Sequence, residues 1–406
     1  MNRSAINNHA TTPKADLLFM SVTRLHEDEQ GRLRSTDPLM SAAEWEPFLQ
    51  TFNKITVLAR VEPGLVRNEG YLLHERLEVV PIPYYSGVVN YYRKRAEILD
   101  FIFNYIADPE QVYYMWVPTQ IAGPISKKVK EIGAALILRV IGDPAGVAKS
   151  ILPTPANHLA ARIEQRKLRR TVQYADGIIY VTLRTLQELY PPSQEALVQA
   201  RTDVVFSPEL LAITKKRRHD AEKDFSIIAV GSQQQNYKGH DLLIKAVGSL
   251  QKRGYDISLT LVGQGAKHEE LRSLAKELQV KGAFFIERLG FSLDVARYVS
   301  TFDMFAMPSR TEGMPKALLE AMAVGVLSIG SSVGGIPEIL EEECLFEPNS
   351  VSALEERIAF LIENRDLAEE QRELQSEKIA LIHEHYSGNQ VIENFLESFL
   401  NQKVYR

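Results

Sequence analysis

The sequence predicts an α/β protein of two domains, each a doubly wound parallel sheet flanked by helices. The chain has 406 residues, more than most single hydrophobic cores contain, so two domains of about 200 residues each are expected. Short apolar runs alternate with longer amphipathic stretches, as in sheets whose parallel strands are joined by helical crossovers. The alternation is interrupted over 207–222, where we expect a linker between the domains.

The composition is that of a folded globular protein, because 45% of the residues are hydrophobic and 24% are charged. A net charge of −5 does not favour nucleic acid as a partner, since its phosphates attract basic proteins. The single cysteine, Cys344, has no partner for an intrachain disulfide, and the nine histidines show no zinc-ligand spacing. No apolar run reaches the roughly 18 residues of a membrane span. We therefore expect a cytoplasmic protein that binds no metal.

The first domain is expected over 16–206, after a flexible polar segment over 1–15. Its buried strands are predicted at the apolar runs. These runs are 17–23, 55–61, 77–82, 112–117, 135–141 and 177–181. Helical spacing of apolar residues is found over 41–52, 91–106, 123–132 and 158–174.

The second domain, expected over 223–385, repeats the alternation more cleanly. Five apolar runs predict its strands. These runs are 226–230, 258–262, 283–286, 304–307 and 326–329. Apolar residues at helical spacing predict helices over 241–250 and 269–278. The tail over 388–400 is amphipathic, and we expect it to pack away from the second domain.

The segment from Pro308 to Ala323 combines a strand end, a glycine turn and a helix start. Pro315 suits the first turn of that helix, where no N–H is needed. Gly313 lets the backbone approach a ligand closely. The unpaired N–H groups at the helix start, with the positive end of the helix dipole behind them, attract negative charge. We therefore predict an anion site at this turn.

Two carboxylates flank the predicted anion site, Glu312 in the turn and Glu320 inside the helix. A diphosphate on the helix start would leave one carboxylate near a group on its outer phosphate and the other near a ribose. Carboxylates bind paired hydroxyls well, so a nucleotide-sugar has the matching shape. The spacing also allows a plainer interpretation, in which Glu312 is a surface residue and Glu320 pairs with Lys316 on the helix.

A second loop with phosphate-binding features follows the strand at 226–230. Lys238 stands just before a predicted helix, where its charge can neutralise a phosphate, and Gly231 permits close approach of the backbone. The loop contains neither a GxGxxG nor a GxxxxGK[ST] pattern. A solvated lysine in a turn is the alternative that this loop leaves open.

An ordered series of short motifs runs through about 130 residues of the C-terminal half. The series consists of Val230-Gly231, Tyr237-Lys238-Gly239-His240-Asp241, Leu261-Val262-Gly263-Gln264-Gly265, Leu289-Gly290-Phe291, Pro308 to Gly313, Leu319 to Ala323 and Gly334-Gly335-Ile336-Pro337-Glu338. In this order the motifs resemble the retaining, nucleotide-sugar-dependent glycosyltransferases of family 4 (group 1), which have the GT-B fold. Glu312 and Glu320, with seven residues between them, match the E-x7-E signature of that family.

The resemblance implies two Rossmann-like domains that face each other across a cleft, with the donor site in the second. It implies that the residue at Glu312 contacts the donor sugar, Glu320 the ribose and Lys238 the phosphates. The residues implied to bind the donor are Gly231, Ser232, Lys238, Gly263, Leu289, Arg310, Glu312, Gly313, Met314, Pro315 and Glu320. It also implies that the segment over 386–406 forms a last helix that crosses back to the first domain.

One position departs from the family pattern. Many members have an arginine directly after the Val-Gly of the first motif, whereas this chain has Ser232. Arg310 or another basic group would replace the missing cation, or Lys238 and the helix dipoles would stabilise the diphosphate without it.

The N-terminal half matches the family more loosely. Asp143 follows a strand where the family commonly places a polar residue that faces the reaction centre; an N-cap or turn residue before Pro144 is the alternative. The loop over 31–37 is placed where the first domain meets the phosphates, or it is simply a loop. Tyrosine pairs and a tryptophan could line an acceptor groove or belong to the core. They are Tyr84-Tyr85, Tyr91-Tyr92, Tyr113-Tyr114 and Trp116.

The reaction implied is transfer of a hexose from a nucleotide-sugar to an acceptor hydroxyl with retention at the anomeric carbon, in polysaccharide, glycolipid or other glycan biosynthesis. The sequence has no Asp-x-Asp, which favours transfer without a metal or other cofactor. Glu312, Lys238 and Asp143 are the candidate catalytic residues. The acceptor is expected to be a glycan, a lipid-linked or a small molecule. A basic helix over 162–170 would be solvated or make peripheral contact with the inner face of a membrane.

Two alternatives from other classes stay open. The first is a non-catalytic GT-B subunit that binds a nucleotide or glycan. Ser232, which stands where many family members have an arginine, is compatible with this alternative. The second is a sugar-nucleotide epimerase or hydrolase of the same fold. The presence of both Glu312 and Glu320 favours transfer over either alternative.

Overall fold

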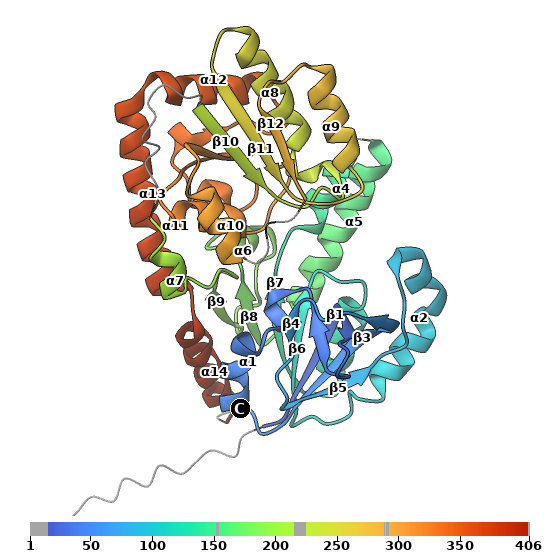
Figure 1. Cartoon of the computed structure of the whole chain (residues 1–406). Coiled ribbons are helices and arrows are strands. Elements are labelled where there is room, and N and C mark those ends of the chain that lie inside the picture. The colour runs from blue at the N-terminus through green and yellow to red at the C-terminus, as the bar shows by residue number, and fades with distance from the viewer. Residues whose placement is uncertain (1–14, 152–153, 215–224, 288, 290–291, 405–406) are drawn as a thin grey trace, which may run out of the picture.

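The computed structural model describes residues 15–151, 154–214, 225–287, 289 and 292–404. These residues form two α/β domains, drawn one above the other in Figure 1. Each domain is built on a parallel sheet that is flanked by helices, so the predicted fold class is confirmed. Most of the segment expected to be flexible and half of the expected linker lie outside the described residues, and so do two residues of the Leu289-Gly290-Phe291 motif.

In the described part of the chain, the sheet of the first domain has nine strands. They are β1 (Leu17–Glu27), β2 (Leu33–Ser35), β3 (Ile55–Val66), β4 (Tyr71–Leu72), β5 (Leu77–Pro81), β6 (Val112–Val117), β7 (Ala135–Val140), β8 (Gly177–Tyr180) and β9 (Leu197–Ala200). The parallel strands run in the order β5-β3-β1-β6-β7-β8-β9. The short strands β2 and β4 extend the far end of β1 in antiparallel fashion.

Helices cover both faces of this sheet. They are α1 (Ala42–Thr51), α2 (Gly87–Phe103), α3 (Ala122–Glu131), α4 (Pro144–Ile151), α5 (Pro155–Val172) and α6 (Thr185–Leu189), with a short 3-10 helix η1 (Pro38–Met40) before α1. Every residue of β6 and β7 is buried. Strands covered on both faces need mostly apolar side chains, which explains the apolar runs of both strands in the sequence. The exception is Arg139 in β7, which is 1% exposed and pairs with Glu44 at 2.9 Å.

The second domain has a six-stranded parallel sheet in the residues that the structure describes. Its strands are β10 (Phe225–Val230), β11 (Ile257–Val262), β12 (Ala283–Ile286), β13 (Met304–Met307), β14 (Leu327–Ser331) and β15 (Leu345–Phe346). They run in the order β12-β11-β10-β13-β14-β15. Its helical elements are η2 (Asn236–Lys238), α8 (His240–Lys252), α9 (His268–Glu277), α10 (Ser292–Val299), α11 (Lys316–Ala323), η3 (Ile336–Glu338), η4 (Glu342–Cys344), α12 (Val351–Glu363) and α13 (Arg365–Tyr386).

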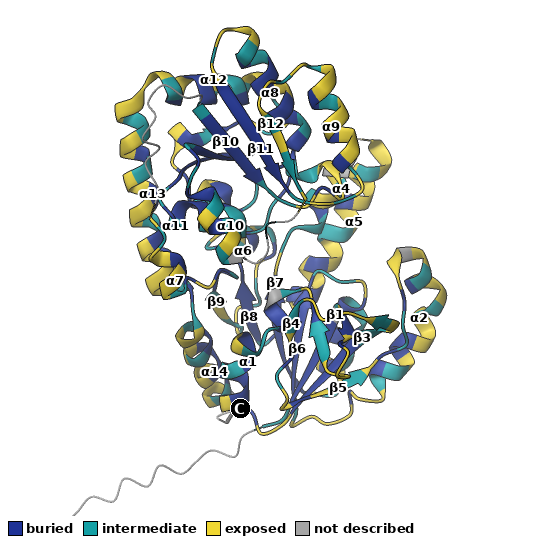
Figure 2. Cartoon of the chain, viewed as in Figure 1, coloured by how far each residue is buried: buried dark blue, intermediate teal, exposed yellow. Residues whose placement is uncertain are grey.

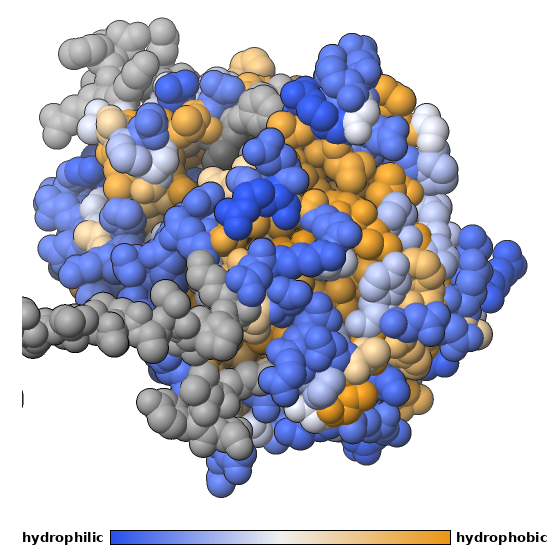
Figure 3. All heavy atoms as spheres, turned by 90° about the horizontal axis from the view of Figure 1, so that it is seen from below, coloured by the Kyte–Doolittle hydropathy of each residue, from blue (hydrophilic) through white to orange (hydrophobic). Residues whose placement is uncertain are grey.

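The central strands of both sheets are buried, whereas edge strands such as β9 and β12 are partly exposed and the outer faces of the helices are exposed (Figure 2). The far end of the first domain presents many hydrophilic residues, with hydrophobic ones visible between them (Figure 3). Among the described helices, none combines the length and the apolar character needed to cross a membrane.

Two segments connect the domains. The first contains the short helix α7 (Pro208–Leu211), at the start of the expected linker. The second leads from α13 to the last helix, α14 (Asn389–Val404). Apolar side chains of α14, including Phe395 and Phe399, belong to the same buried cluster as β1, β3 and α1 of the first domain. The first domain is therefore completed by the C-terminal part of the chain (Figure 1).

Candidate active site between the two domains

Each sheet has a point at which its strand order reverses. In the second domain the reversal lies between β10 and β13, which are neighbours in the sheet. Ligands of open α/β sheets bind in the crevice at the carboxyl ends of the two strands that flank such a point. Gly231 follows β10 and Pro308 follows β13, so both predicted donor-site loops start at this crevice.

The two predicted loops meet through an ion pair. Nζ of Lys238 lies 2.7 Å from Oε1 of Glu312, and the hydroxyl of Ser309 donates to the same oxygen at 2.6 Å. The side chain of Glu312 is only 8% exposed and that of Lys238 17%. Neither residue is therefore a solvated surface residue, which contradicts the plainer interpretations of both. Gly231 makes room for this arrangement, because a Cβ atom there would lie 3.2 Å from Cγ of Lys238.

Close backbone contacts between loops explain two glycines of the sequence motifs. Gly239 has a φ of +69°, and a Cβ atom on it would overlap the carbonyl oxygen of Pro308. A Cβ atom on Gly263 would overlap the carbonyl oxygen of Gly231. The first glycine joins the loop after β10 to the end of β13, and the second joins it to the end of β11. These glycines shape the crevice by allowing its loops to pack against one another.

Arg310, a candidate replacement for the cation missing at Ser232, is held by a carboxylate. Its two terminal nitrogens lie 2.8 and 2.9 Å from the two oxygens of Asp241. The guanidinium also donates to the carbonyl oxygen of Asn236. Arg310 thus fastens η2 and the start of α8 to the end of β13. Ser232 is exposed at the mouth of the same loop, and a direct contact of Arg310 with the donor stays a prediction.

His240 lies beneath this loop and is 4% exposed. Burial, with a smaller contribution from the positive charge of Lys238, lowers the pKa of His240 to about 4. The imidazole is therefore neutral near pH 7, so Lys238 is the cation that this motif presents to a ligand.

Helix α11 begins at the anion site. Pro315 is its N-cap residue and Lys316 its first helical residue, one position later than the sequence predicts, because the extended ψ of 106° at Pro315 is not helical. Met314 is buried just before it. Glu320, within α11, lies near the first domain. The pKa of the Tyr71 phenol on β4 is raised first by burial and then by the negative charge of Glu320.

The first domain contributes the other wall of the site. A Cβ atom on Gly313 would lie only 2.7 Å from the carbonyl oxygen of Ile141, which follows β7. Asp37, at the end of the predicted contact loop over 31–37, is close enough for the charge of Lys316 to act on its carboxyl group, although burial raises the pKa of Asp37 overall. The turn and the start of α11 therefore face the carboxyl edge of the first sheet.

A carboxylate of the second domain binds the backbone of the first. Glu338, in η3, accepts hydrogen bonds of 2.6 Å from the N–H groups of Leu183 and Thr185 and a longer one of 3.3 Å from Arg184. The hydroxyl of Thr185 donates to the carbonyl oxygen of Gly334. Glu338 was visible in the sequence only as part of a motif, and its partners lie more than 150 residues away. These contacts hold the two domains together beside the site.

Asp143 caps the N-terminus of the helix that follows it, α4. Its two carboxylate oxygens accept hydrogen bonds from the N–H groups of Ala145 and Gly146 in the first turn of α4, so the N-cap interpretation is confirmed. The hydroxyl of Tyr190 donates to the same carboxylate, and burial followed by this bond raises the pKa of Tyr190. A contact of Asp143 with the sugar stays a prediction.

The aromatic pairs divide into two groups. Tyr113, Tyr114 and Trp116 lie within β6 and are buried, and Trp116 donates from its indole nitrogen to the hydroxyl of Tyr114. These three residues belong to the core. Tyr92 by contrast is 56% exposed on α2, in a cluster with Tyr85 and Tyr91.

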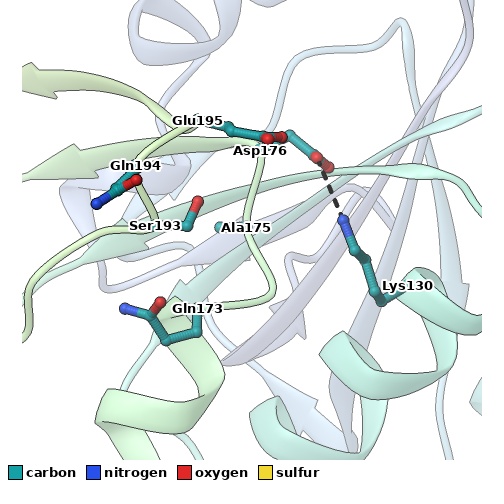
Figure 4. A pocket seen from close by; sticks show the side chains of 7 residues that line it. All are labelled: Lys130, Gln173, Ala175, Asp176, Ser193, Gln194 and Glu195. Atoms are coloured by element: carbon teal, nitrogen blue, oxygen red, sulfur yellow. Dashed lines mark ion pairs between the residues drawn. The ribbon is translucent and has the colours of Figure 1, made fainter.

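A separate polar pocket of about 320 Å³ lies elsewhere on the first domain. Figure 4 shows Lys130 and Asp176 on its wall, with Nζ and Oδ1 3.8 Å apart. Asp176 precedes β8 and accepts a hydrogen bond from the N–H of Leu136 near the start of β7. The pocket is therefore at the amino edge of the sheet, opposite to the edge that meets Gly313. No group of three or more metal-ligating side chains is gathered in the part of the chain that the structure describes.

Comparison with known proteins identifies the second domain. Residues 212–378 match the family described as Glycosyl transferases group 1. The second domain is a group 1 glycosyltransferase domain. Every residue of the crevice in this domain falls within the matched range.

Relatives extend the similarity into the first domain. Protein CapJ of Staphylococcus aureus is 24% identical over 340 residues, which are 80% of this chain and 82% of CapJ. A GDP-mannose-dependent monoacylated alpha-(1-6)-phosphatidylinositol monomannoside mannosyltransferase of Corynebacterium glutamicum is 29% identical over 255 residues, 57% of this chain and 66% of that protein.

The arrangement of the two domains is also found in a solved structure. Sucrose-phosphate synthase from Thermosynechococcus elongatus superimposes with a TM-score of 0.70 over 97% of this chain and 100% of that chain, at 14% identity. This likeness concerns the fold. The chain has the GT-B fold, as its motifs predict.

Proposed function

We propose that the protein is a retaining glycosyltransferase that transfers a hexose from a nucleotide-sugar to an acceptor hydroxyl in polysaccharide, glycolipid or other glycan biosynthesis. The observation that carries the proposal is the partly buried Lys238–Glu312 pair, which lies at the switch point of the second sheet and next to the start of α11. A cation, a helix start and a carboxylate that can bind hydroxyls are the groups that a sugar diphosphate needs.

The leaving diphosphate is the centre of the proposed mechanism. Negative charge grows on its bridging oxygen as the bond to the anomeric carbon breaks. Lys238 and the N–H groups at the start of α11 are fixed in place by packing, so they stabilise this charge without reorganising. Together they supply the positive charge that a metal ion provides in other transferases. We therefore propose that the transfer needs no metal ion.

The two glutamates are proposed to position the donor. Glu312 accepts hydrogen bonds from hydroxyls of the sugar, and Glu320 from those of the ribose. Because Glu312 already holds Lys238 at 2.7 Å, the sugar and the phosphate that carries it are bound by groups whose distance is set in advance.

The acceptor hydroxyl is proposed to attack from the side on which the leaving group departs. A phosphate oxygen of the leaving diphosphate takes the hydroxyl proton as the new C–O bond forms, so no protein group needs to act as a base. The first domain, in contact with Gly313 through Ile141, excludes water from the sugar and presents the acceptor.

A donor panel tests this function. Purified protein is mixed with UDP-, GDP-, ADP- and dTDP-sugars and with mixed glycan and lipid acceptors, in the presence of EDTA, and both nucleotide release and the anomeric configuration of the product are recorded by NMR. We expect release from one donor, insensitive to EDTA, with retention. Glu312→Gln and Lys238→Gln should lower kcat/KM by about 100-fold, the usual size of a lost electrostatic contact to the transition state.

Glu269→Gln is the matched control, because Glu269 is on the exposed face of α9 with its side chain 80% exposed. Inversion at the anomeric carbon would refute the proposed mechanism. Tight nucleotide binding without turnover would identify the non-catalytic subunit instead, and turnover that is independent of any acceptor would identify an epimerase or hydrolase.

A further inference from the structure

The first sheet has a switch point of its own, between β1 and β6, where the strand order reverses. Arg24 lies on β1 beyond the irregularity that follows Met20, and Thr119 and Gln120 follow β6. By the general rule for open α/β sheets, this crevice is a second place for a ligand. Its edge is the carboxyl edge, which faces the second domain at Ile141.

Two arginines occupy paired positions on β1 and β3, the strand on the side of β1 away from β6. Arg24 is the register partner of Arg60 on the neighbouring strand β3. Burial lowers the pKa of Arg60, and the charge of Arg24 lowers it further, whereas Glu62 acts in the opposite direction. The side chain of Arg60 is fixed: its Nη1 donates to the carbonyl oxygen of Tyr85 at 3.1 Å and its guanidinium lies 4.6 Å from the centre of the Tyr85 ring. An anion that contacts both arginines would offset the repulsion between their charges.

Tyrosines of α2 and of the segment between β5 and α2 lie beside Arg60. The rings of Tyr85 and Tyr91 are 5.4 Å apart, and those of Tyr91 and Tyr92 5.2 Å apart. The hydroxyl of Tyr91 donates to the carbonyl oxygen of Gln120, which ties α2 to the end of β6. Lys94 on α2 adds a further positive charge, with its Nζ 3.0 Å from the carbonyl oxygen of Tyr84.

Two hydroxyl groups at the crevice are buried without a hydrogen-bond partner in the described residues. They are the phenol of Tyr85, a residue that is only 4% exposed, and Oγ1 of Thr119. A buried hydroxyl without a partner costs free energy, and in native structures such groups are often completed by a ligand or by water. Tyr85 contacts Arg60 and Tyr91, and Thr119 directly precedes Gln120, whose carbonyl oxygen accepts the hydrogen bond from Tyr91.

We propose that Arg24, Arg60, Tyr85 and Thr119 form an acceptor subsite that binds a phosphate group. A phosphate monoester carries a charge of about −1.5 to −2 at neutral pH, which matches the two guanidinium groups, whereas a carboxylate would compensate only one of them. Guanidinium groups bind phosphate oxygens bidentately, and the hydroxyls donate to the oxygens that remain. The inference rests on the proposed function, since it concerns the molecule that receives the sugar.

Calorimetric titration tests the subsite with probes of known charge. The full-length protein is titrated with glucose, with glucose 6-phosphate, and with vesicles of phosphatidylcholine with and without phosphatidylinositol 4-phosphate, whose outer phosphate is a monoester. We expect binding of at least one phosphate-bearing probe and none of its uncharged counterpart. Arg24→Gln should weaken that binding by about tenfold, the effect of one lost charged hydrogen bond. Arg24 is exposed, so this variant is expected to fold even if Arg60→Gln does not.

Two further variants separate this site from the donor site. Lys127→Gln, which removes a charge whose side chain is 66% exposed on α3, should leave binding unchanged. Lys238→Gln should abolish UDP or GDP binding but retain the phosphate-bearing probe. Preference for the vesicles would identify a lipid headgroup as the source of the phosphate, and preference for glucose 6-phosphate a soluble acceptor; either supports the proposal.

Equal binding of glucose and glucose 6-phosphate, absence of binding of every phosphate probe, or binding that Lys238→Gln removes and Arg24→Gln does not would each overturn the subsite. Failure of the proposed function has a different signature, which is loss of donor turnover in the panel described above while the phosphate probes still respond to Arg24→Gln.

Discussion

At the scale of single residues, the predicted donor-site loops are defined by how closely their backbones approach one another. Gly239 is the sharpest case, because its φ of +69° and its contact with the carbonyl oxygen of Pro308 both exclude a side chain. Gly254 offers a comparison: its φ is +96°, but a Cβ atom there would meet nothing within 4 Å. The two positions separate the effect of backbone conformation from the effect of packing.

Replacement of these glycines should therefore have unequal effects. Gly254→Ala is expected to lower the free energy of unfolding by about 1 kcal/mol, through backbone strain alone. Gly239→Ala should cost several times more and should also displace Lys238, so that nucleotide binding is lost. Urea unfolding and nucleotide titration of both variants check this. Similar values for the two variants would show that packing against Pro308 is unimportant.

The buried His240 makes stability depend on pH. Its pKa is about 4 in the folded protein and about 6.5 in an unfolded chain. The unfolded state therefore binds more protons between these values, and stability present above pH 6.5 is lost as the pH falls toward 4. We expect the free energy of unfolding to fall by about 2 kcal/mol from pH 6.5 to 5.

His240→Gln should remove most of this slope. Glu44, another buried group, has its pKa lowered to about 2 although burial alone would raise it, because the charges of Arg201 and Arg139 outweigh burial. Its contribution is lost only below about pH 4.5, as the pH approaches 2, so the two groups act in different windows. A slope between pH 6.5 and 5 that is unchanged in His240→Gln would assign the dependence to other groups.

At the scale of elements, the last helix is part of the first domain. A Cβ atom on Gly177, in β8, would lie 2.8 Å from two ring atoms of Phe399 and 3.0 Å from Phe395. The strand therefore lacks a side chain at the point where the rings of α14 pack against it. Close packing of the two phenylalanine rings against Gly177 fixes the position of α14 on the first sheet.

A double-mutant cycle tests this packing. Gly177→Ala should overpack the contact and lower the free energy of unfolding by about 1–3 kcal/mol. Phe399→Leu alone should also destabilise, through lost apolar burial, but in combination the two changes should be less destabilising than their sum. Additive effects in urea unfolding would mean that α14 moves aside rather than packing on β8.

How far the sequence predicts these elements depends on their length and on the range of their contacts. The apolar run of β6 predicts its ends without error, because six consecutive buried residues leave a continuous signal. Strands β2 and β4, of three and two residues, are too short for any alternation to show. Asp143 looks the same in the sequence whether it caps α4 or meets a sugar, since both roles need only a carboxylate after a strand.

The sequence predicts the candidate site only in part, as it does the helices and strands. Glu312 and Lys238 stood out because each follows a strand in a motif of its own, and the structure brings them together. The role of Glu338 was not predicted, since its partners are backbone N–H groups of another domain. Backbone donors have no sequence signature, so a contact of this kind appears only when the domains are assembled.

At the scale of the whole molecule, Glu338 fastens one domain to the other beside the site. We expect Glu338→Ala to shift the domains toward a more open arrangement, because the N–H groups of Leu183 and Thr185 lose their charged acceptor. kcat should fall by about tenfold, while the affinity for nucleotide, which we propose that the second domain binds, should not change.

Small-angle scattering and steady-state kinetics measure both effects. Glu341→Ala is the matched control: Glu341 is on the same domain, with its side chain 50% exposed and 4.0 Å from Lys378. A loss of nucleotide affinity in Glu338→Ala, equal to the loss of kcat, would place Glu338 in the donor site instead of at the domain contact.

The position of α14 has a consequence for biosynthesis. During translation the second domain leaves the ribosome with all of its strands, β10 to β15, in one uninterrupted stretch. The first domain emerges earlier but waits for Phe395 and Phe399, which complete its buried cluster. In a nascent chain, the first domain therefore exposes apolar surface while the second domain is being made and folds. We expect chaperones to be needed most during this stage of synthesis.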